Sequence, residues 1–146
     1  MNPDQTSILK PSSPAPPRRV FTVAQATSTL VLVRKIVRDI VARYRQLMTL
    51  REQRQALALL AGQAESIEQL DKRLAAAHDA LANLQAELSE VGCVLKDWAD
   101  GLVDFPAEYQ GRAVWLCWRL DEPTITHWHE ADTGYAGRHP IPPDFS

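Results

Sequence analysis

The stretch LVLVRKIVRDIVARYRQL, residues 30–47, decides the fold of this chain. Its apolar residues recur at alternating gaps of three and four positions: Leu30, Val33, Val37, Ile40, Tyr44 and Leu47. This 3.5-residue repeat predicts an α-helix with one apolar seam, as in a coiled coil. Four further apolar residues widen the seam beyond what contact with one other helix needs: Ile36, Val41, Met48 and Leu50. We therefore expect this helix to pack against two partners at once.

Capping signals mark the two ends of this helix and predict the start of a second one. Thr22 and Gln25 match a capping box, and Gly62 is a natural stop signal, so the first helix is expected to run to about Ala61. Ser66 and Gln69 match a second box. A second heptad series follows and ends at Gly92: Ile67, Leu70, Leu74, Ala77, Leu81, Leu84, Leu88 and Val91. Two capped helices joined by a short turn predict a long antiparallel helical hairpin.

The end of the chain has a different character, because eight of the ten aromatic residues lie after position 97. Leu102–Phe105 and Val114–Leu120 read as strands joined by the turn residues 109–112, and a third strand is expected at 94–95 or 125–129. In an extended segment alternate side chains share a face. Val114, Leu116, Trp118 and Leu120 are therefore expected in the core, and Trp115, Cys117 and Arg119 on the opposite face.

These patterns predict an α+β fold that is mostly α: a coiled-coil-like helical hairpin with a small C-terminal β-hairpin and loop module packed on it. Residues 1–19 contain five of the ten prolines and are expected to form a disordered tail. Residues 20–146 then form a single domain, divided into a hairpin at 20–92 and an aromatic-rich β/loop module at 93–146.

The charge of the chain is close to neutral overall but strongly uneven. A net charge of −2 excludes a globally basic nucleic-acid-binding protein. Residues 18–54 carry nine basic and two acidic residues, whereas residues 55–146 carry six basic and fifteen acidic ones. Such a separation indicates a partner of opposite charge, inside the chain or outside it. With no long apolar run and no signal peptide, we expect a cytoplasmic protein that does not bind membranes.

A polar set near the C-terminus is the candidate ligand site. Arginine binds carboxylates and phosphates in a bidentate manner and stacks on aromatic rings, so a small anionic ligand fits this composition. The same residues fit a structural network that joins the β-hairpin to the C-terminal loop, and we favour this interpretation over the ligand site. The candidate ligand-binding residues are Arg119, Glu122, Trp128, His129 and Arg138.

Cys117 suggests two kinds of chemistry and one plain alternative. With His127 and His129 it could bind zinc, because one cysteine and two histidines suit that metal. With Arg119 beside it and His129 as base, it could act as a nucleophile. An inert thiol packed between two tryptophans is the third interpretation and the one we favour, so no metal or other cofactor is expected.

The C-terminal motifs resemble a known family. The stretch Leu116-Cys117-Trp118-Arg119-Leu120-x-Glu122-Pro123 is followed by Trp128-His129 and by Gly134-Tyr135-x-Gly137-Arg138. Two earlier stretches, Arg19 to Ala26 and Gly101 to Pro106, fit the same pattern. Together they resemble an uncharacterised prokaryotic family, domain of unknown function 2203, over roughly residues 18–140. The resemblance brings no activity with it.

Two functions from different classes remain open. The favoured one is a non-enzymatic interaction or scaffold protein that self-associates, and a dimer is expected. The wide apolar seam and the uneven charge both indicate a binding partner. The alternative is a small-molecule or anion site, with or without catalysis, in the C-terminal module. Nucleic-acid binding by the basic helix is disfavoured by the acidic remainder of the chain.

Overall fold

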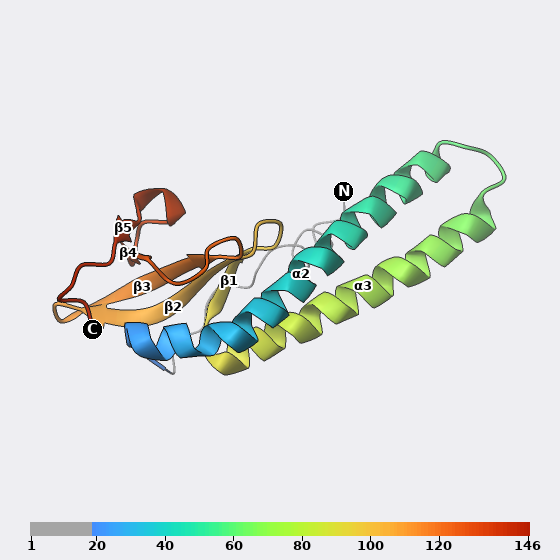
Figure 1. Ribbon diagram of the computed structural model, residues 1–146. Helices are drawn as coiled ribbons and strands as arrows, with labels where there is room; N and C mark the ends of the chain where they lie inside the picture. The colour runs from blue at the N-terminus through green and yellow to red at the C-terminus, as the bar shows by residue number, and fades with distance from the viewer. Residues whose placement is uncertain (1–18) are drawn as a thin grey trace.

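A computed structural model describes residues 19–146, so the predicted tail lies outside the described residues except for Arg19. Two long helices, α2 (Val23–Ala58) and α3 (Ala64–Val91), pack together as a hairpin. One antiparallel sheet follows, in the order β1 (Val94–Asp97), β2 (Leu102–Tyr109), β3 (Arg112–Arg119), β4 (His127–Glu130) and β5 (His139–Pro140). A short 3₁₀ helix, η1 (Tyr135–Gly137), precedes β5. Figure 1 shows the sheet at one end of an elongated hairpin. The predicted α+β, mostly α fold is confirmed.

Helix α2 begins as the sequence predicts and ends earlier. The Thr22 side chain accepts from the backbone N–H of Gln25 at 3.1 Å, and the Gln25 side chain accepts from the backbone N–H of Thr22 at 3.0 Å. The helix ends at Ala58 and not near Ala61. Gly62, with φ of 76°, supplies the left-handed conformation inside the connecting turn, so it does not cap the helix itself.

The predicted start of the second helix is wrong. Helix α3 begins at Ala64, and Gln63 occupies the N-cap without a side-chain hydrogen bond. Ser66 lies within the first turn, because Ala64 and Glu65 are good helix formers and the Glu65 charge suits a helix N-terminus. At the other end Gly92 closes the helix with φ of 109°, as expected.

The sheet contains more strands than the sequence predicted. The expected hairpin is formed by β2 and β3, which pair from Leu102 with Arg119 to Tyr109 with Arg112. Both segments considered for a third strand join it, as β1 beside β2 and as β4 beside β3. The expected division of faces is found for Val114, Leu116 and Trp118, which are buried in the hydrophobic core. Leu120 lies just after β3 and is only partly buried against that core.

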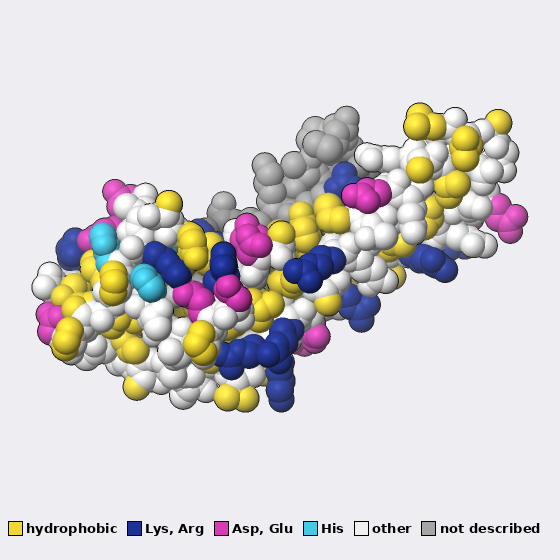
Figure 2. Space-filling model, turned by 45° about the horizontal axis from the view of Figure 1, so that its top comes forward, with side chains coloured by type: hydrophobic (Ala, Val, Ile, Leu, Met, Phe, Trp, Pro, Cys, Tyr) yellow, Lys and Arg dark blue, Asp and Glu magenta, His cyan; other side chains and the backbone are white. Residues whose placement is uncertain are grey.

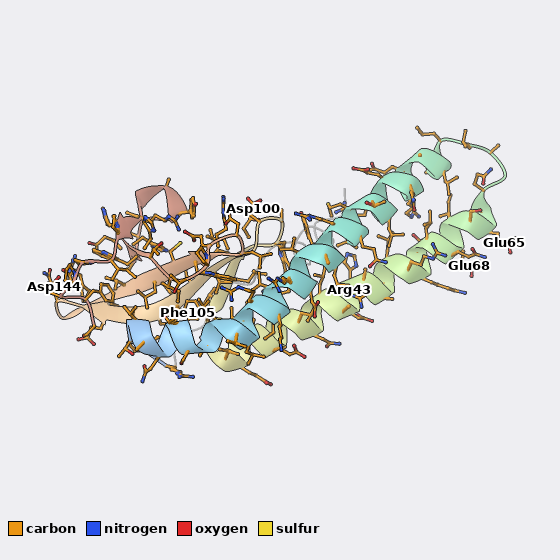
Figure 3. The ribbon with its side chains drawn as sticks, in the orientation of Figure 1. Arg43, Glu65, Glu68, Asp100, Phe105 and Asp144 are labelled. Atoms are coloured by element: carbon orange, nitrogen blue, oxygen red, sulfur yellow. The ribbon has the colours of Figure 1, made fainter. Side chains whose placement is uncertain are left out.

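The width of the α2 seam is explained by two partners, because its first half packs against the sheet as well as against α3. Just before α2, Phe21 meets the ring of Phe105 edge-on at 5.3 Å between centroids; Figure 3 labels Phe105, which belongs to β2. Tyr44 of α2 stacks on Trp98, in the β1–β2 turn, at 6.4 Å between centroids. In the β1–β2 turn, a Cβ on Gly101 would lie 2.7 Å from a methyl group of Val37, so this close approach requires glycine.

The second half of the hairpin extends away from the sheet (Figure 1). Its interior comprises Leu47, Leu50, Leu70 and Ala77, which are buried between α2 and α3. Within residues 19–146, no helix combines the length and the apolar character needed to cross a membrane. Apart from the four buried residues named above, the side chains of this outer half are exposed or half-buried.

Candidate functional site

Three strands place polar side chains on the face of the sheet that points away from α2. Asp104 on β2 pairs in register with Cys117 on β3, which pairs with His127 on β4. His129 lies two residues further along β4 and therefore on the same face. Asp104, Cys117 and His129 are each at most 3% exposed, and one ligand atom from each lies within 4.8 Å of the other two. We call these three residues the buried triad.

The closest contact in the buried triad joins His129 to Asp104. His129 Nε2 lies 2.9 Å from Asp104 Oδ2, while Nδ1 lies 2.7 Å from the carbonyl oxygen of Glu130. Because a carbonyl only accepts, Nδ1 carries a proton. Burial lowers the pKa of His129, but the hydrogen bond and charge of Asp104 outweigh that effect and raise the pKa above its usual value. The pair is thus a buried imidazolium–carboxylate contact when Nε2 is also protonated.

Cys117 lies beside this pair and next to Arg138. Arg138 Nη1 approaches the sulfur at 4.0 Å. Burial raises the pKa of the Cys117 thiol to about 12, so the free thiol is neutral at physiological pH. The base suggested by the sequence, His129, directs its two ring nitrogens to Asp104 and to a carbonyl. This arrangement does not support the nucleophile hypothesis, which needs a thiolate and a free base.

A bidentate ion pair adjoins the buried triad. Arg138 donates to the two carboxylate oxygens of Glu122 at 3.0 and 2.8 Å, and the Glu122 side chain also accepts from the backbone N–H of Arg119 at 2.8 Å. Burial raises the pKa of Glu122. The hydrogen bonds from Arg138 and from the Arg119 backbone lower it by more, so the pKa of Glu122 lies below its usual value. Arg138 also lies over the Tyr135 ring, 4.2 Å from its centroid. The pair ties the segment after η1 to the end of β3.

The predicted ligand set is only partly brought together. Glu122, His129 and Arg138 surround Cys117, whereas Arg119 turns to Asp121, with hydrogen bonds of 2.7 and 2.6 Å. Trp128 packs on the other side of the sheet, near Tyr109 and Phe145. Because carboxylates occupy both arginines, an anionic ligand would have to displace them.

The zinc set suggested by the sequence also changes its membership. His127 hydrogen-bonds Thr126 through Nδ1 at 2.8 Å and is not a member of the buried triad. Asp104 takes its place, a residue that sequence reasoning missed. One signal was available: Asp104 is a single acid in the otherwise apolar stretch Leu102–Ala107, at a position where strand alternation directs it away from Val103 and Phe105.

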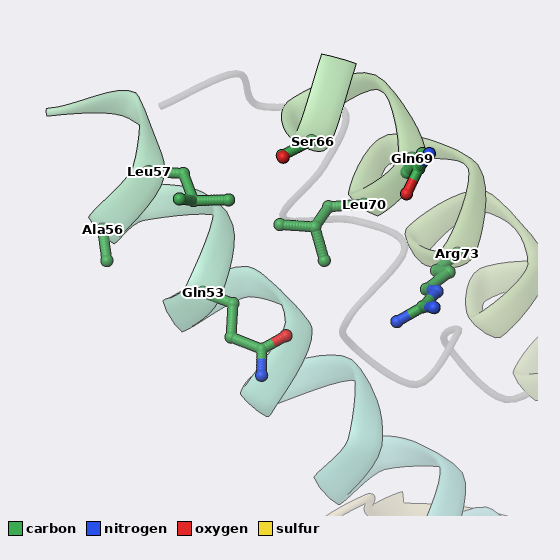
Figure 4. Close-up of a pocket in the computed structure, with 7 residues that line it drawn as sticks. All are labelled: Gln53, Ala56, Leu57, Ser66, Gln69, Leu70 and Arg73. Carbon is green, nitrogen blue, oxygen red and sulfur yellow. The ribbon is translucent and has the colours of Figure 1, made fainter. Parts of the chain in front are cut away.

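A second candidate surface lies at the outer end of the hairpin. Leu59 is 88% exposed and Leu60 is 59% exposed. Between α2 and α3, a groove of about 420 Å³ opens beside them, and Leu57 and Leu70 point into it (Figure 4). Its lining residues are Gln53, Ala56, Leu57, Ser66, Gln69, Leu70 and Arg73. We call Leu59, Leu60 and this groove the tip surface; Figure 2 shows hydrophobic side chains at that end.

Comparison with known proteins places the chain in a family without assigning it an activity. Residues 19–141 match a family described as an uncharacterized conserved protein, DUF2203. Searches of curated proteins and of solved structures found no match. The residues that carried the resemblance in the sequence include Cys117, Glu122, His129 and Arg138, which the fold gathers around one point. Because the match spans all but the two ends of the chain, this protein belongs to the DUF2203 family.

Proposed function

We propose that this protein is a non-enzymatic interaction protein that self-associates through the tip surface of its hairpin. The observation that carries the proposal is the exposure of Leu59 and Leu60 beside an apolar groove. Exposed leucines next to a groove that can accept them are typical of a contact surface between proteins. Two copies related by a twofold axis can each place these leucines in the groove of the other.

The charges of the two helices support a second copy as the partner. Helix α2 carries seven basic and two acidic residues, and α3 carries six acidic and two basic ones. Within residues 19–146, Arg54 with Asp71 is the single ion pair that joins the two helices. Most of these charges are therefore not neutralised within the chain. In an antiparallel pair of hairpins, α2 of each copy faces α3 of the other, so their charges attract.

A cytoplasmic location belongs to the same proposal. Cys93 and Cys117 are both free and buried. Unpaired cysteines are usual in a reducing compartment, where disulfides rarely persist.

Sedimentation equilibrium of the full-length protein tests the proposal. The unaltered chain is expected to be a dimer at micromolar concentration. A variant with Leu59→Ser and Leu60→Ser removes four leucine contacts per dimer. Since each buried leucine contributes about 1.5–3 kcal/mol, the dissociation constant is expected to rise by at least about 100-fold.

Val31 and Leu32 provide a matched control, because they are 68% and 53% exposed on the half of α2 that lies near the sheet. A variant with Val31→Ser and Leu32→Ser is expected to remain a dimer. Circular dichroism should show unchanged helix content in both variants. A monomeric unaltered protein, or equal dissociation of the two variants, overturns the proposal.

A further inference from the structure

We infer that Asp104, Cys117 and His129 bind a zinc ion. The three side chains come from three adjacent strands, their ligand atoms lie within 4.8 Å of one another, and all three are buried. In a tetrahedral zinc site, ligand oxygen, nitrogen and sulfur atoms lie roughly 3.3–3.6 Å apart. Side-chain shifts of roughly 1 Å therefore bring the set onto one ion, without a change in the sheet.

The hydrogen bonds of His129 prepare it as a ligand. Zinc-binding histidines usually donate their second ring N–H to a carbonyl or a carboxylate, which fixes the ring and its tautomer. His129 Nδ1 meets this requirement at the carbonyl oxygen of Glu130, 2.7 Å away. The other nitrogen then faces Asp104 Oδ2 at 2.9 Å. In the metal-free protein a proton joins these two atoms, and a metal ion can take the place of that proton.

Asp104 gives an independent indication of a missing partner. The residue is 2% exposed, and its second carboxylate oxygen, Oδ1, is buried with no hydrogen-bond partner in the described part of the chain. Leaving a buried charged oxygen unsatisfied costs free energy, so such atoms are uncommon unless they bind something. An ion held by this carboxylate accounts for the position of an acid inside the sheet module.

The surroundings of Cys117 complete the arrangement. Arg138 approaches the sulfur at 4.0 Å and is held in place by Glu122. Arg138 and Glu122 neutralise each other, so the charge of the site depends on its ligands. The Asp104 carboxylate and a Cys117 thiolate carry two negative charges, which one Zn²⁺ balances. On binding, the thiol proton and any proton between Asp104 and His129 pass to solvent, and no atom changes oxidation state.

The chemistry of the set selects zinc over the harder cations. Calcium and magnesium prefer oxygen ligands alone, whereas a thiolate and an imidazole suit zinc. Three protein ligands leave the fourth position of a tetrahedral ion to a water molecule. The site differs from the one suggested by the sequence, because Asp104 replaces His127 as the third ligand.

Metal titration of the full-length, untagged protein tests this inference after treatment with a chelator. We expect one Zn²⁺ per chain by calorimetry and by native mass spectrometry. Co²⁺ in place of zinc is expected to give the intense thiolate-to-cobalt charge-transfer absorption of a cysteine-bound ion. The variants Cys117→Ser, His129→Gln and Asp104→Asn are each expected to lose stoichiometric zinc binding.

The chain supplies a matched control for two of these variants. Cys93→Ser removes the other buried cysteine, and His127→Gln removes the histidine two positions away on the same strand. Both controls are expected to bind one zinc ion. Absence of zinc binding, or equal binding by Cys117→Ser and Cys93→Ser, overturns the inference. If the triad variants fail to fold, the cobalt spectrum of the unaltered protein decides, because a spectrum without charge-transfer absorption excludes Cys117 as a ligand.

Discussion

Glu122 connects several parts of the C-terminal module through one residue. Its carboxylate accepts from the backbone of Arg119 on β3 and from both terminal nitrogens of Arg138. Its carbonyl oxygen accepts from the indole N–H of Trp118 at 3.0 Å. With only 17% of the side chain exposed, the carboxylate is poorly solvated and depends on these donors. The residue holds the segment after η1 against the sheet.

Replacing Glu122 by Gln is expected to lower the free energy of unfolding at pH 7 by about 1–2 kcal/mol, because the charged hydrogen bonds to Arg138 are lost. The pKa of Glu122 is lowered in the folded state. The stabilisation is therefore present above the pKa of the unfolded chain, about 4.3, and is lost as the pH falls through the lower folded value. Urea denaturation at pH 7 and at acid pH should show the difference between variant and parent shrinking at low pH.

Asp121 is the control for this prediction. It forms a similar pair with Arg119, but 62% of its side chain is exposed. Asp121→Asn is expected to change stability by less than about 1 kcal/mol, as for other solvent-exposed ion pairs. A Glu122→Gln variant that loses no more stability than Asp121→Asn would mean that the Glu122–Arg138 ion pair contributes little to stability.

At the scale of whole elements, the helices could be predicted because their information is local. The heptad spacing of α2 and α3 and the box at Thr22 depend only on neighbours within one or two turns. The start of α3 was misplaced because a Ser-x-x-Gln pattern also occurs inside helices, where the serine has no free N–H group to cap. The number of strands was underestimated because β1, β4 and β5 are two to four residues long.

The two capping patterns give a direct comparison at this scale. Thr22→Ala removes a real N-cap and is expected to lower the free energy of unfolding by about 1 kcal/mol. Ser66→Ala changes a residue within the first turn of α3 and is expected to leave stability unchanged or slightly raised, because alanine is the better helix former. Chemical denaturation of both variants checks this; a loss at Ser66 as large as that at Thr22 would contradict the observed start of α3.

The candidate site could be predicted only in part, because its residues meet through strand register. Cys117, Glu122, His129 and Arg138 were identified from residue type and proximity in sequence. Asp104 is 25 positions from His129, and only the β2–β3–β4 register brings the two together. Proximity in sequence also groups Trp128 and His127 with the site, but Trp128 lies on the opposite face of the sheet and His127 hydrogen-bonds Thr126.

At the scale of the whole molecule, the two ends of the hairpin have different surroundings. One end is fixed to the sheet by Phe21, Tyr44 and the close approach at Gly101. The other end has only the contact between α2 and α3, and it presents the tip surface (Figures 1 and 2). The net charge of −2 therefore hides an uneven distribution, in which a basic α2 and an acidic α3 run side by side along an exposed arm.

This arrangement makes the proposed dimer sensitive to the sign of the charges on the outer half of the hairpin. A variant with Arg45→Glu and Arg51→Glu has two acidic helices in the outer half of the hairpin, and a variant with Glu65→Lys and Glu68→Lys has two basic helices there. Each copy alone is expected to dimerise more weakly than the parent at low salt, where charges about 10 Å or more apart still interact. Mixing the two copies in equal amounts should restore a dimer, because each acidic α2 then faces a basic α3.

The opposite net charges of the two variants could also draw them together. A control must therefore make the same change in net charge at a different place on the molecule. Arg19→Glu with Lys96→Glu makes the same change in charge at the sheet end, where both residues are exposed. This variant is expected to remain a dimer by sedimentation, whereas the copy with acidic substitutions on α2 dissociates. Equal dissociation of the two would assign the effect to net charge, and the pairing of α2 with the partner's α3 would then have to be abandoned. If the dimer reforms in the mixture and the sheet-end control remains a dimer, the outer halves of the two hairpins are in contact.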